Sequence, residues 1–155
     1  MRRWGRIAGV LLAGQAMTGG VHAAVYPVDD SASQVLDPRP AMQWESVAPV
    51  RGGGNRVTGQ VTVLVRLQVA PWLERSGRVF MTLPERPEGP VSATWTTRGV
   101  LQPGRVQSGE RALIYAGRIR TDHLEDTLSL TLTTDGTRLT RQERLQFRFF
   151  IEVDE

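Results

Sequence analysis

The stretch that decides the fold is 57–69, with the sequence VTGQVTVLVRLQV. Its odd-numbered positions are Val, Leu or Gly, and its even-numbered positions are polar apart from Leu64. Side chains of a β-strand point alternately to the two faces of its sheet, so a period of two predicts a strand with one face in the core. β-branched residues, which dominate the stretch, favour strands. The stretch therefore predicts one long, half-buried strand.

The same kind of signal continues to the end of the chain. Alternation or strand-like composition recurs at 78–83, 91–97, 112–120, 127–133 and 143–153, with Gly and Pro between the segments. No segment has apolar residues at the i, i+3, i+4 spacing of an amphipathic helix. This organisation predicts an all-β fold, an immunoglobulin-like β-sandwich of six to seven strands. A small antiparallel barrel is the alternative.

Several local features refine this prediction. Trp95 lies on an apolar strand face and is expected in the core, whereas Trp72 follows a strand-ending Pro and is a candidate for exposure. Gly117 is expected at a bulge or a close contact. Asp135-Gly136 is the strongest hairpin signal in the chain. The segment 123–126 has room for one short turn.

The first 23 residues have the organisation of a secretory signal peptide. Three Arg precede the apolar run 7–14 (IAGVLLAG), and small residues occupy the positions before a cleavage site after Ala23. Cleavage there leaves Ala24 as the first mature residue. The apolar run is shorter than the ~20 residues of a membrane-spanning helix, and no later segment could span a bilayer as a helix. A retained N-terminal anchor is the alternative.

The charge of the chain follows from that segment. The 155 residues include 19 Lys+Arg and 16 Asp+Glu, which gives a net charge of +3. The three Arg of the first 23 residues account for this excess because no acid accompanies them. A neutral mature chain with interspersed charges argues against nucleic-acid binding. The absence of Cys excludes disulfides, thiolate catalysis and Cys-ligated metal.

The mature chain divides into an arm, 24–56, and a sandwich domain, 57–155. Four Pro and a Gly-rich linker (52–54) in the arm predict an extended segment that does not nucleate a core. Within it, however, 41–50 (AMQWESVAPV) alternates as a strand does. One face of that segment carries Met42, Trp44, Ser46, Ala48 and Val50. Such a face indicates a strand that inserts into an apolar groove.

The residues give little support for chemistry. His123 is the single His of the mature chain and is flanked by acids, so Ser108 or Ser129 could formally complete a Ser–His–Asp site. No nucleophile-elbow motif or oxyanion hole accompanies them. A metal at Asp122, His123 and Asp126 would match neither an EF-hand nor a paired-His spacing. We expect no catalytic residues, no cofactor and no metal, and the loop acids Glu85 and Glu88, like 51–54, are interpreted as solvated loop or linker.

An exported all-β chain with an alternating N-terminal segment before a Gly linker resembles the pilus subunits assembled by the chaperone–usher route. In that family each immunoglobulin-like subunit lacks one strand, and the N-terminal extension of a neighbouring subunit supplies it by β-augmentation. The resemblance implies that 41–50 is the donor strand, with the five anchor positions named above. Since this chain has no Cys, it is more similar to the Cys-free colonisation-factor or alternate-type branch.

Two functions are therefore expected, and neither is enzymatic. The first is a structural subunit of a surface pilus or fimbria, a shaft or minor linking subunit that polymerises by donor-strand exchange. Its partners would be neighbouring subunits, a periplasmic chaperone and an outer-membrane usher. It would pass through the periplasm to the cell surface. The alternative is a self-contained periplasmic or surface β-sandwich that binds a protein or carbohydrate, with the arm completing its own sheet or docking a partner.

Overall fold

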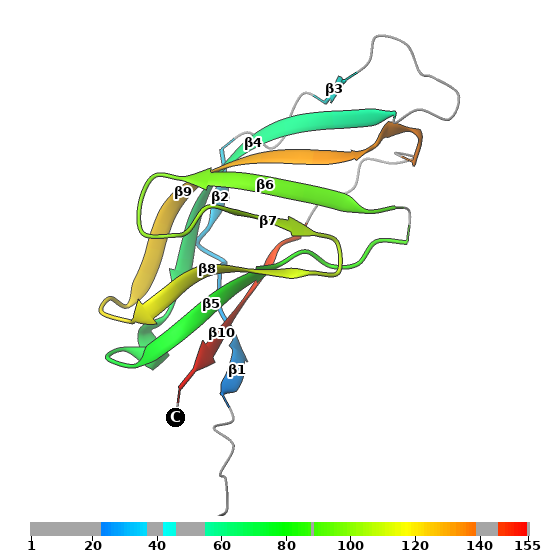
Figure 1. Cartoon of the computed structure of the whole chain (residues 1–155). Coiled ribbons are helices and arrows are strands. Elements are labelled where there is room, and N and C mark those ends of the chain that lie inside the picture. Colours follow the sequence, from blue (N-terminus) through cyan, green and yellow to red (C-terminus); the bar gives the residue numbers. More distant parts are fainter. Residues whose placement is uncertain (1–22, 37–41, 46–54, 88, 139–145, 155) are drawn as a thin grey trace, which may run out of the picture.

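The computed structural model describes residues 23–36, 42–45, 55–87, 89–138 and 146–154 (Figure 1). Its strands are β1 Ala24–Pro27, β2 Gln34–Val35, β3 Gln43–Trp44, β4 Arg56–Gln68, β5 Ser76–Thr82, β6 Val91–Thr97, β7 Gly104–Gln107, β8 Arg111–Arg118, β9 His123–Asp135 and β10 Arg148–Val153. Helical structure in these ranges is limited to two 3₁₀ turns, Ala70–Trp72 and Gly136–Arg138. The expected all-β class is confirmed.

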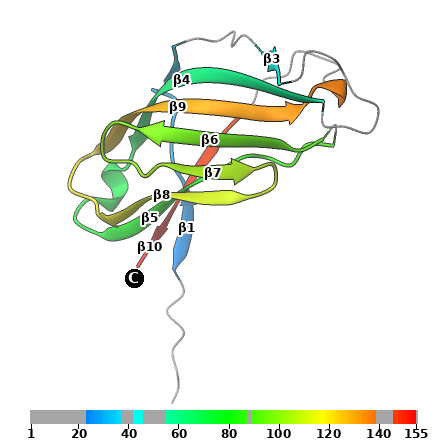
Figure 2. The same cartoon turned by 45° about the horizontal axis from the view of Figure 1, so that its top comes forward.

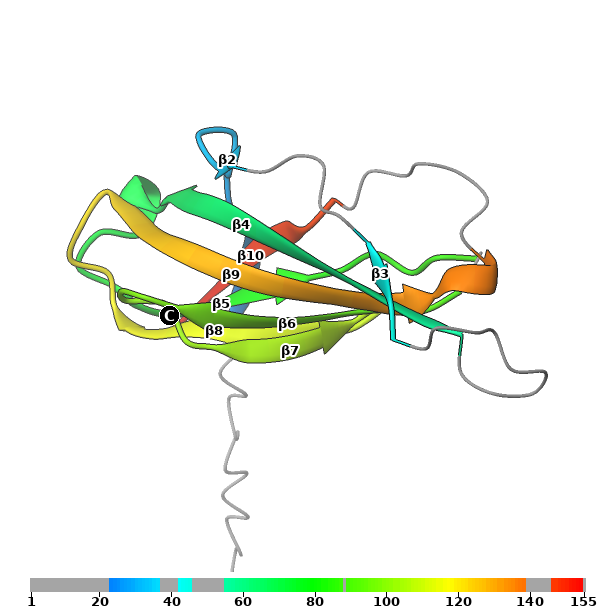
Figure 3. The same ribbon diagram turned by 90° about the horizontal axis from the view of Figure 1, so that it is seen from above.

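The strands form two antiparallel sheets that pack face to face. The larger sheet has six strands in the order β2-β4-β9-β6-β7, and β3 pairs beside β2 on the outer edge of β4. The smaller sheet has four strands in the order β1-β10-β5-β8. Seen from above, β4 and β9 cross over β10 and β5 of the other sheet (Figure 3). The molecule is thus a β-sandwich, as the sequence predicts.

The stretch 57–69 forms the strand expected of it, and its partner is longer than expected. β4 pairs with β9 along thirteen residues, from Arg56↔Asp135 to Gln68↔His123. The sequence predicted β9 only for 127–133 and left 123–126 to a turn, which is wrong. Leu124 and Asp126 are buried and continue the alternation of β9, so this segment stays in the ladder.

The Asp135-Gly136 pair does not make the expected hairpin. The strand after β9 is β10, and it lies in the other sheet between β1 and β5. The Asp135 carboxylate instead accepts hydrogen bonds from the backbone N–H and the hydroxyl of Thr137, at 3.0 and 2.7 Å. This closes a local Asx turn into the 3₁₀ segment Gly136–Arg138.

The irregularity expected at Gly117 lies nearby in β8. Val79 pairs with Tyr115 and Phe80 pairs with Leu113, so Ile114 is the extra residue of a β-bulge. Ile114 is fully buried. Gly117 remains in the ladder opposite Gly77, with a φ of 152° that favours glycine.

The core fills the space between the sheets, and Trp95 is central to it. Trp95 is 1% exposed, as predicted, and its Nε1–H donates to the carbonyl of Gln102 at 2.9 Å. Trp72 is only partly buried, packs against the core and meets the ring of Tyr26 at 5.8 Å. The other fully buried large side chains come from both sheets: Leu67, Met81, Leu83, Ile114, Ile119, Leu128 and Ile151.

The segment 24–36 was expected in an extended arm and instead lies on the sandwich. β1 pairs with β10, Asp29 bridges to Gln68, and β2 pairs with Leu64 and Val63 of β4. Val28 is 6% exposed and belongs to the core. Short strands and an isolated bridge hold this segment, which is why the Pro- and Ser-containing sequence gave little strand signal.

Candidate functional site

The candidate site is the outer edge of β10, the last strand of the chain. Phe149, Ile151 and Val153 of β10 are buried in the core, and β5 covers one edge of the strand. Of the described strands, only β1 lies on the other edge; it is four residues long and antiparallel, from Ala24↔Val153 to Pro27↔Phe150 (Figures 1 and 2). A core strand therefore has its outer edge covered by a short terminal strand.

β1 is held by its backbone more than by its side chains. Val25 and Tyr26 are 53% and 41% exposed, and Pro27 is exposed as well. The buried anchor is Val28, just after the strand, whose N–H donates to the carbonyl of Phe149 at 2.9 Å. Main-chain pairing with few side-chain anchors is the chemistry of β-augmentation, in which one segment can replace another.

The outer face of the smaller sheet indicates that a strand paired with β10 must place an apolar side chain beside Phe150. Pro27 lies opposite Phe150, Phe150 opposite Phe80, and Phe80 opposite Leu113, so an apolar row crosses all four strands. The Arg111 guanidinium lies over the Phe80 ring, 4.4 Å from its centroid. Pro27 completes the row on the outer strand, so the register of β1 is set by an apolar neighbour for Phe150.

A charged row flanks the apolar one. The carboxylate of Glu152, opposite Val25, lies 2.6 Å from Nη1 of Arg111 and 3.3 Å from Nη2 of Arg78. Glu152 is 9% exposed, and its two partners satisfy both of its oxygens. A strand at this edge therefore passes beside a carboxylate whose charge is neutralised by two Arg. In β1 the residue opposite this carboxylate is the apolar Val25.

The ladder between β1 and β10 ends at Phe150 and does not reach Arg148, the first residue of β10. In the described ranges no strand pairs with the outer edge of β10 beyond Pro27↔Phe150. β7 and β8 contact each other at one side of the sandwich, so β10 and β4 border the opposite side. There Val61, Val63 and Phe147 are only partly buried. Among the described residues, this side therefore places partly buried apolar side chains beside the end of the β1–β10 ladder.

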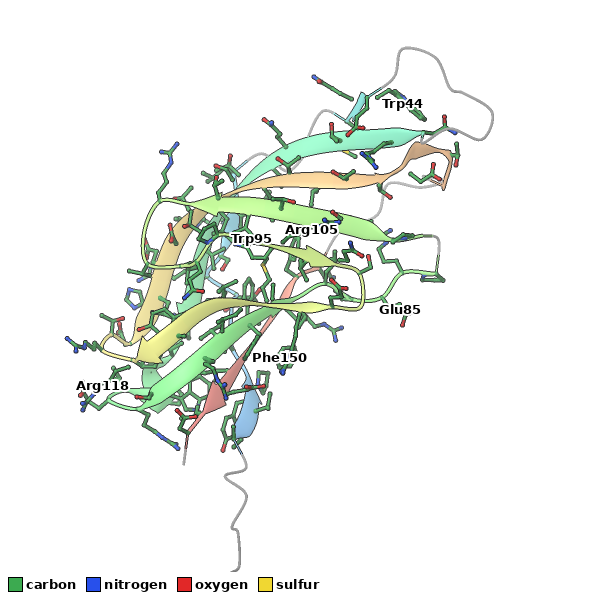
Figure 4. All side chains as sticks on the ribbon, in the orientation of Figure 1. Trp44, Glu85, Trp95, Arg105, Arg118 and Phe150 are labelled. Carbon is green, nitrogen blue, oxygen red and sulfur yellow. The ribbon has the colours of Figure 1, made fainter. Side chains whose placement is uncertain are left out.

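The predicted donor segment 41–50 is described only in part. Met42 and Trp44 are 39% and 52% exposed, and Gln43–Trp44 pairs with Thr58 and Val57 on β4. Trp44 lies close over Gly136 at the end of the larger sheet, well away from Phe150 on β10 (Figure 4). Ser46, Ala48 and Val50 lie outside the described residues. Within one chain, the part of the segment that is described thus contacts the larger sheet.

The residues considered for chemistry are not brought together. Nδ1 of His123 lies 2.5 Å from Oδ1 of Asp122. Nε2 of His123 lies 3.2 Å from Nη2 of Arg66, so Arg66 occupies the position that a nucleophile would need. Asp126 points to the opposite face of β9 into the core. Across the described ranges, no three His, Cys, Asp or Glu side chains are placed to hold a metal ion.

The candidate serines are also elsewhere. The Ser108 hydroxyl donates to the carbonyl of Val91 and accepts from its N–H, at 3.2 and 2.9 Å. Ser129 is six residues from His123 along the extended β9, roughly 20 Å at the rise of a strand. Glu85 is exposed in its loop (Figure 4), whereas Glu88 and 51–54 lie outside the described residues. No nucleophile, base and orienting group share a site among the described residues.

Sequence reasoning missed β1 as part of the site. The signal was present in 24–28 (AVYPV), a short apolar run directly after the proposed cleavage point. Pro27 and the acids that follow it concealed this signal, because Pro demotes a strand prediction. Pro27 is tolerated in β1 because the strand is an edge, where no ladder bond is needed on one side.

Comparisons with known proteins gave no match to a family model, to a curated protein or to a solved structure. None of the described helical segments is long and apolar enough to cross a membrane. Function therefore has to be argued from the sequence and from the geometry of the site.

Proposed function

We propose that this chain is an exported structural subunit of a surface fibre of the pilus type, which polymerises by exchanging an N-terminal strand onto β10 of a neighbouring copy. One observation carries the proposal: in the part of the chain that the structure describes, the outer edge of the core strand β10 is covered only by the short, largely exposed β1. A strand from another chain can make the same hydrogen bonds, so exchange changes the free energy little.

The proposed signal peptide fits this arrangement. Cleavage after Ala23 makes Ala24, the first residue of β1, the mature N-terminus. A strand at a free chain end can leave an edge without threading a loop. The chaperone and usher of the resemblance would then act on a subunit whose β10 edge needs cover before assembly.

Two segments are candidates for the exchanged strand. The resemblance implies 41–50 with Met42 and Trp44 as anchors, whereas the geometry adds 24–28, which already pairs with β10. The first would leave β4 to reach a neighbour. The second would move from its own β10 to the neighbour's.

A self-contained β-sandwich that binds a ligand is the second candidate function. It is favoured by the pairing of β1, β2 and β3 with strands of the same chain. The two functions differ in whether β10 accepts a strand from another molecule.

Disulfide trapping separates them, because the chain has no Cys and therefore no background. Ala24 and Val153 are register partners, and Cα atoms of paired residues lie within the range that a disulfide spans. We would mix mature Ala24→Cys protein with a size-tagged Val153→Cys protein under oxidising conditions. A disulfide between the two chains is expected if 24–28 is exchanged.

A second pair follows the other donor segment. Gln43 and Thr58 are register partners, so the Gln43→Cys, Thr58→Cys protein can lock 41–50 onto its own β4. Blocked assembly after oxidation, with recovery on reduction, would identify 41–50 as the donor. If the first mixture gives no interchain disulfide and the locked protein behaves like the reduced one, the fibre proposal is wrong and the self-contained sandwich stands.

A further inference from the structure

A polar groove lies on the outer face of the larger sheet, on the opposite side of that sheet from the core. It has a volume of about 530 Å³, within the range of small-ligand sites. Ser92 lies opposite both Thr133 and Gln107, and Thr94 lies opposite Arg105, so adjacent strands present these side chains as a continuous floor. The full lining is Glu45, Asn55, Arg56, Pro90, Ser92, Thr94, Arg105, Gln107, Thr133, Thr134 and Asp135.

Apart from Pro90, the residues of the lining carry side chains that can form hydrogen bonds. Hydroxyls and amides can both donate and accept, which matches the hydroxyl groups of a sugar. Among the described residues no aromatic side chain lines the groove, so the described lining offers no stacking on a pyranose face. Trp44, near the end of the larger sheet, packs against Val57 and Gly136 on the core-facing side of that sheet. A ligand held here must gain its affinity from polar and charged contacts.

The charged side chains of the groove differ in whether they have a partner. Glu45 is paired with Arg56 at 3.4 Å, and Asp135 accepts from Thr137. Arg105, in contrast, has no hydrogen-bond or ion-pair partner among the described residues, and it is exposed. It lies on β7, toward the opposite edge of the sheet from Trp44 (Figure 4).

The acids and Arg105 lie at different ends of the groove. β4 and β7 are three strand spacings apart, roughly 14 Å at 4.7–4.9 Å each. Glu45 stands at the far end beside Arg56. Asp135 is on β9, but it lies four residues along that strand from Thr131, which is level with Arg105 through Thr94, so neither acid stands beside the guanidinium on β7. A guanidinium binds a carboxylate through two parallel hydrogen bonds, which are stronger than bonds between neutral groups.

From these features we infer that the groove binds a carboxylate-bearing oligosaccharide, with Arg105 holding the carboxylate and the Ser, Thr and Gln side chains holding sugar hydroxyls. The inference does not rest on strand exchange, since β10 and β1 belong to the other sheet. It would give either proposed function a ligand on the outer face of the larger sheet, which exchange of 24–28 leaves unchanged, whereas exchange of 41–50 would remove Glu45 from the lining.

Titration of the mature chain with defined probes tests the site. Trigalacturonate and 3′-sialyllactose carry carboxylates of two sources, maltotriose and lactose are the matched neutral probes, and inorganic sulfate reports simple anion capture. Binding of at least one acidic probe is expected to be about tenfold or more tighter than binding of its neutral match, the factor that one charge-assisted contact supplies. NMR shift changes are expected at Ser92, Thr94 and Arg105.

Variants separate the groove from general positive charge. Arg105→Ala is expected to lower the affinity for the acidic probe about tenfold or more, while Arg105→Lys retains part of it. Arg120→Ala removes an equally exposed Arg outside the groove and is expected to change nothing. A thermal melt of each variant shows that the fold is kept.

The inference is overturned by any of three results. These are no binding of either acidic probe at millimolar concentration, equal losses from Arg105→Ala and Arg120→Ala, or sulfate competing as well as the acidic sugars. Preference for the uronate or the sialyl probe identifies which source of carboxylate the groove accepts.

Discussion

Replacing Asp126 with Ala should destabilise the sandwich strongly, although the residue looks from the sequence like one of several acids in a connector. Asp126 is 5% exposed and lies on the core face of β9. Its Oδ1 accepts from the N–H groups of Arg98 and Thr127 at 3.1 and 2.7 Å, and its Oδ2 accepts from that of Leu101 at 2.9 Å. The carboxylate thereby fixes the loop between β6 and β7.

The magnitude follows from these three bonds. A hydrogen bond to a charged group contributes roughly 1.5–3 kcal/mol, and a buried donor without a partner costs about 1–3 kcal/mol. Leu101 is 3% exposed, so its N–H has no access to water after the change, whereas the other two donors are only part-buried. We expect Asp126→Ala to lower the free energy of unfolding by about 3–4 kcal/mol.

Asp126→Asn should cost less, about 2 kcal/mol, for a geometric reason. The amide oxygen can replace Oδ1, but its NH₂ group then faces the N–H of Leu101, so two donors meet. The loop backbone leaves no room for a shift, since a Cβ at Gly99 would lie 3.2 Å from the Asp126 carboxyl carbon.

Urea unfolding of a protein comprising residues 24–155, followed by Trp fluorescence, measures both variants. A loss of about 3 kcal/mol lowers the midpoint by about 1.5 M when the m value is about 2 kcal/mol/M. Exchange of the Leu101 amide should also lose its protection. Glu125→Ala is the matched control, because Glu125 is the preceding residue on the exposed face and its ion pair with Arg66 is worth about 0–1 kcal/mol. If Asp126→Ala shifts the midpoint no more than this control, the reasoning is refuted.

Three further outcomes are expected. Gly136→Ala should cost about 1–3 kcal/mol, measured by thermal melting, because its Cβ would lie next to a Val57 methyl and 2.5 Å from the Trp44 ring; an unchanged melting temperature would contradict this close approach. Glu152→Gln should lower the free energy of unfolding because it removes the carboxylate charge that pairs with Arg78 and Arg111. The free energy of unfolding should therefore differ less between low and high salt in the variant than in the parent. Hydrogen bonds from the backbone N–H and then the hydroxyl of Ser31 lower the pKa of Asp29 in the folded chain, so the stability it contributes is present at neutral pH and lost as the pH falls through that lowered pKa; an NMR titration should show a lower midpoint than in an unfolded peptide.

The long strands could be predicted because their signal is local. In 57–69 and 127–133 the residues alternate so regularly that only a strand can place the apolar set on one side. The burial of Trp95 follows from the same alternation. The end of β9 was missed because its first residues are acidic, although Leu124 and Asp126 continue the pattern inward.

The type of candidate site could be predicted from the sequence, but not the segment that forms it. An N-terminal strand that pairs with an open edge was expected, but the sequence pointed to 41–50, and the pairing of 24–27 with β10 depends on residues more than a hundred positions apart. Four residues containing a Pro carry too weak a propensity to reveal that pairing. The groove with Arg105 was not predicted either, because it is assembled by the register of four strands.

By itself, the sequence determined most of the long strands and which of their faces are apolar, because the alternation of side chains is built into an extended backbone. It also determined the absence of thiol chemistry and the concentration of the excess positive charge in the first 23 residues. The tertiary structure alone decided which strands are neighbours, that Asp126 serves the core while His123 faces outward, and that the chain crosses to the other sheet after Asp135. These are outcomes of pairing between distant segments, where many weak contacts act together, and no local pattern records them.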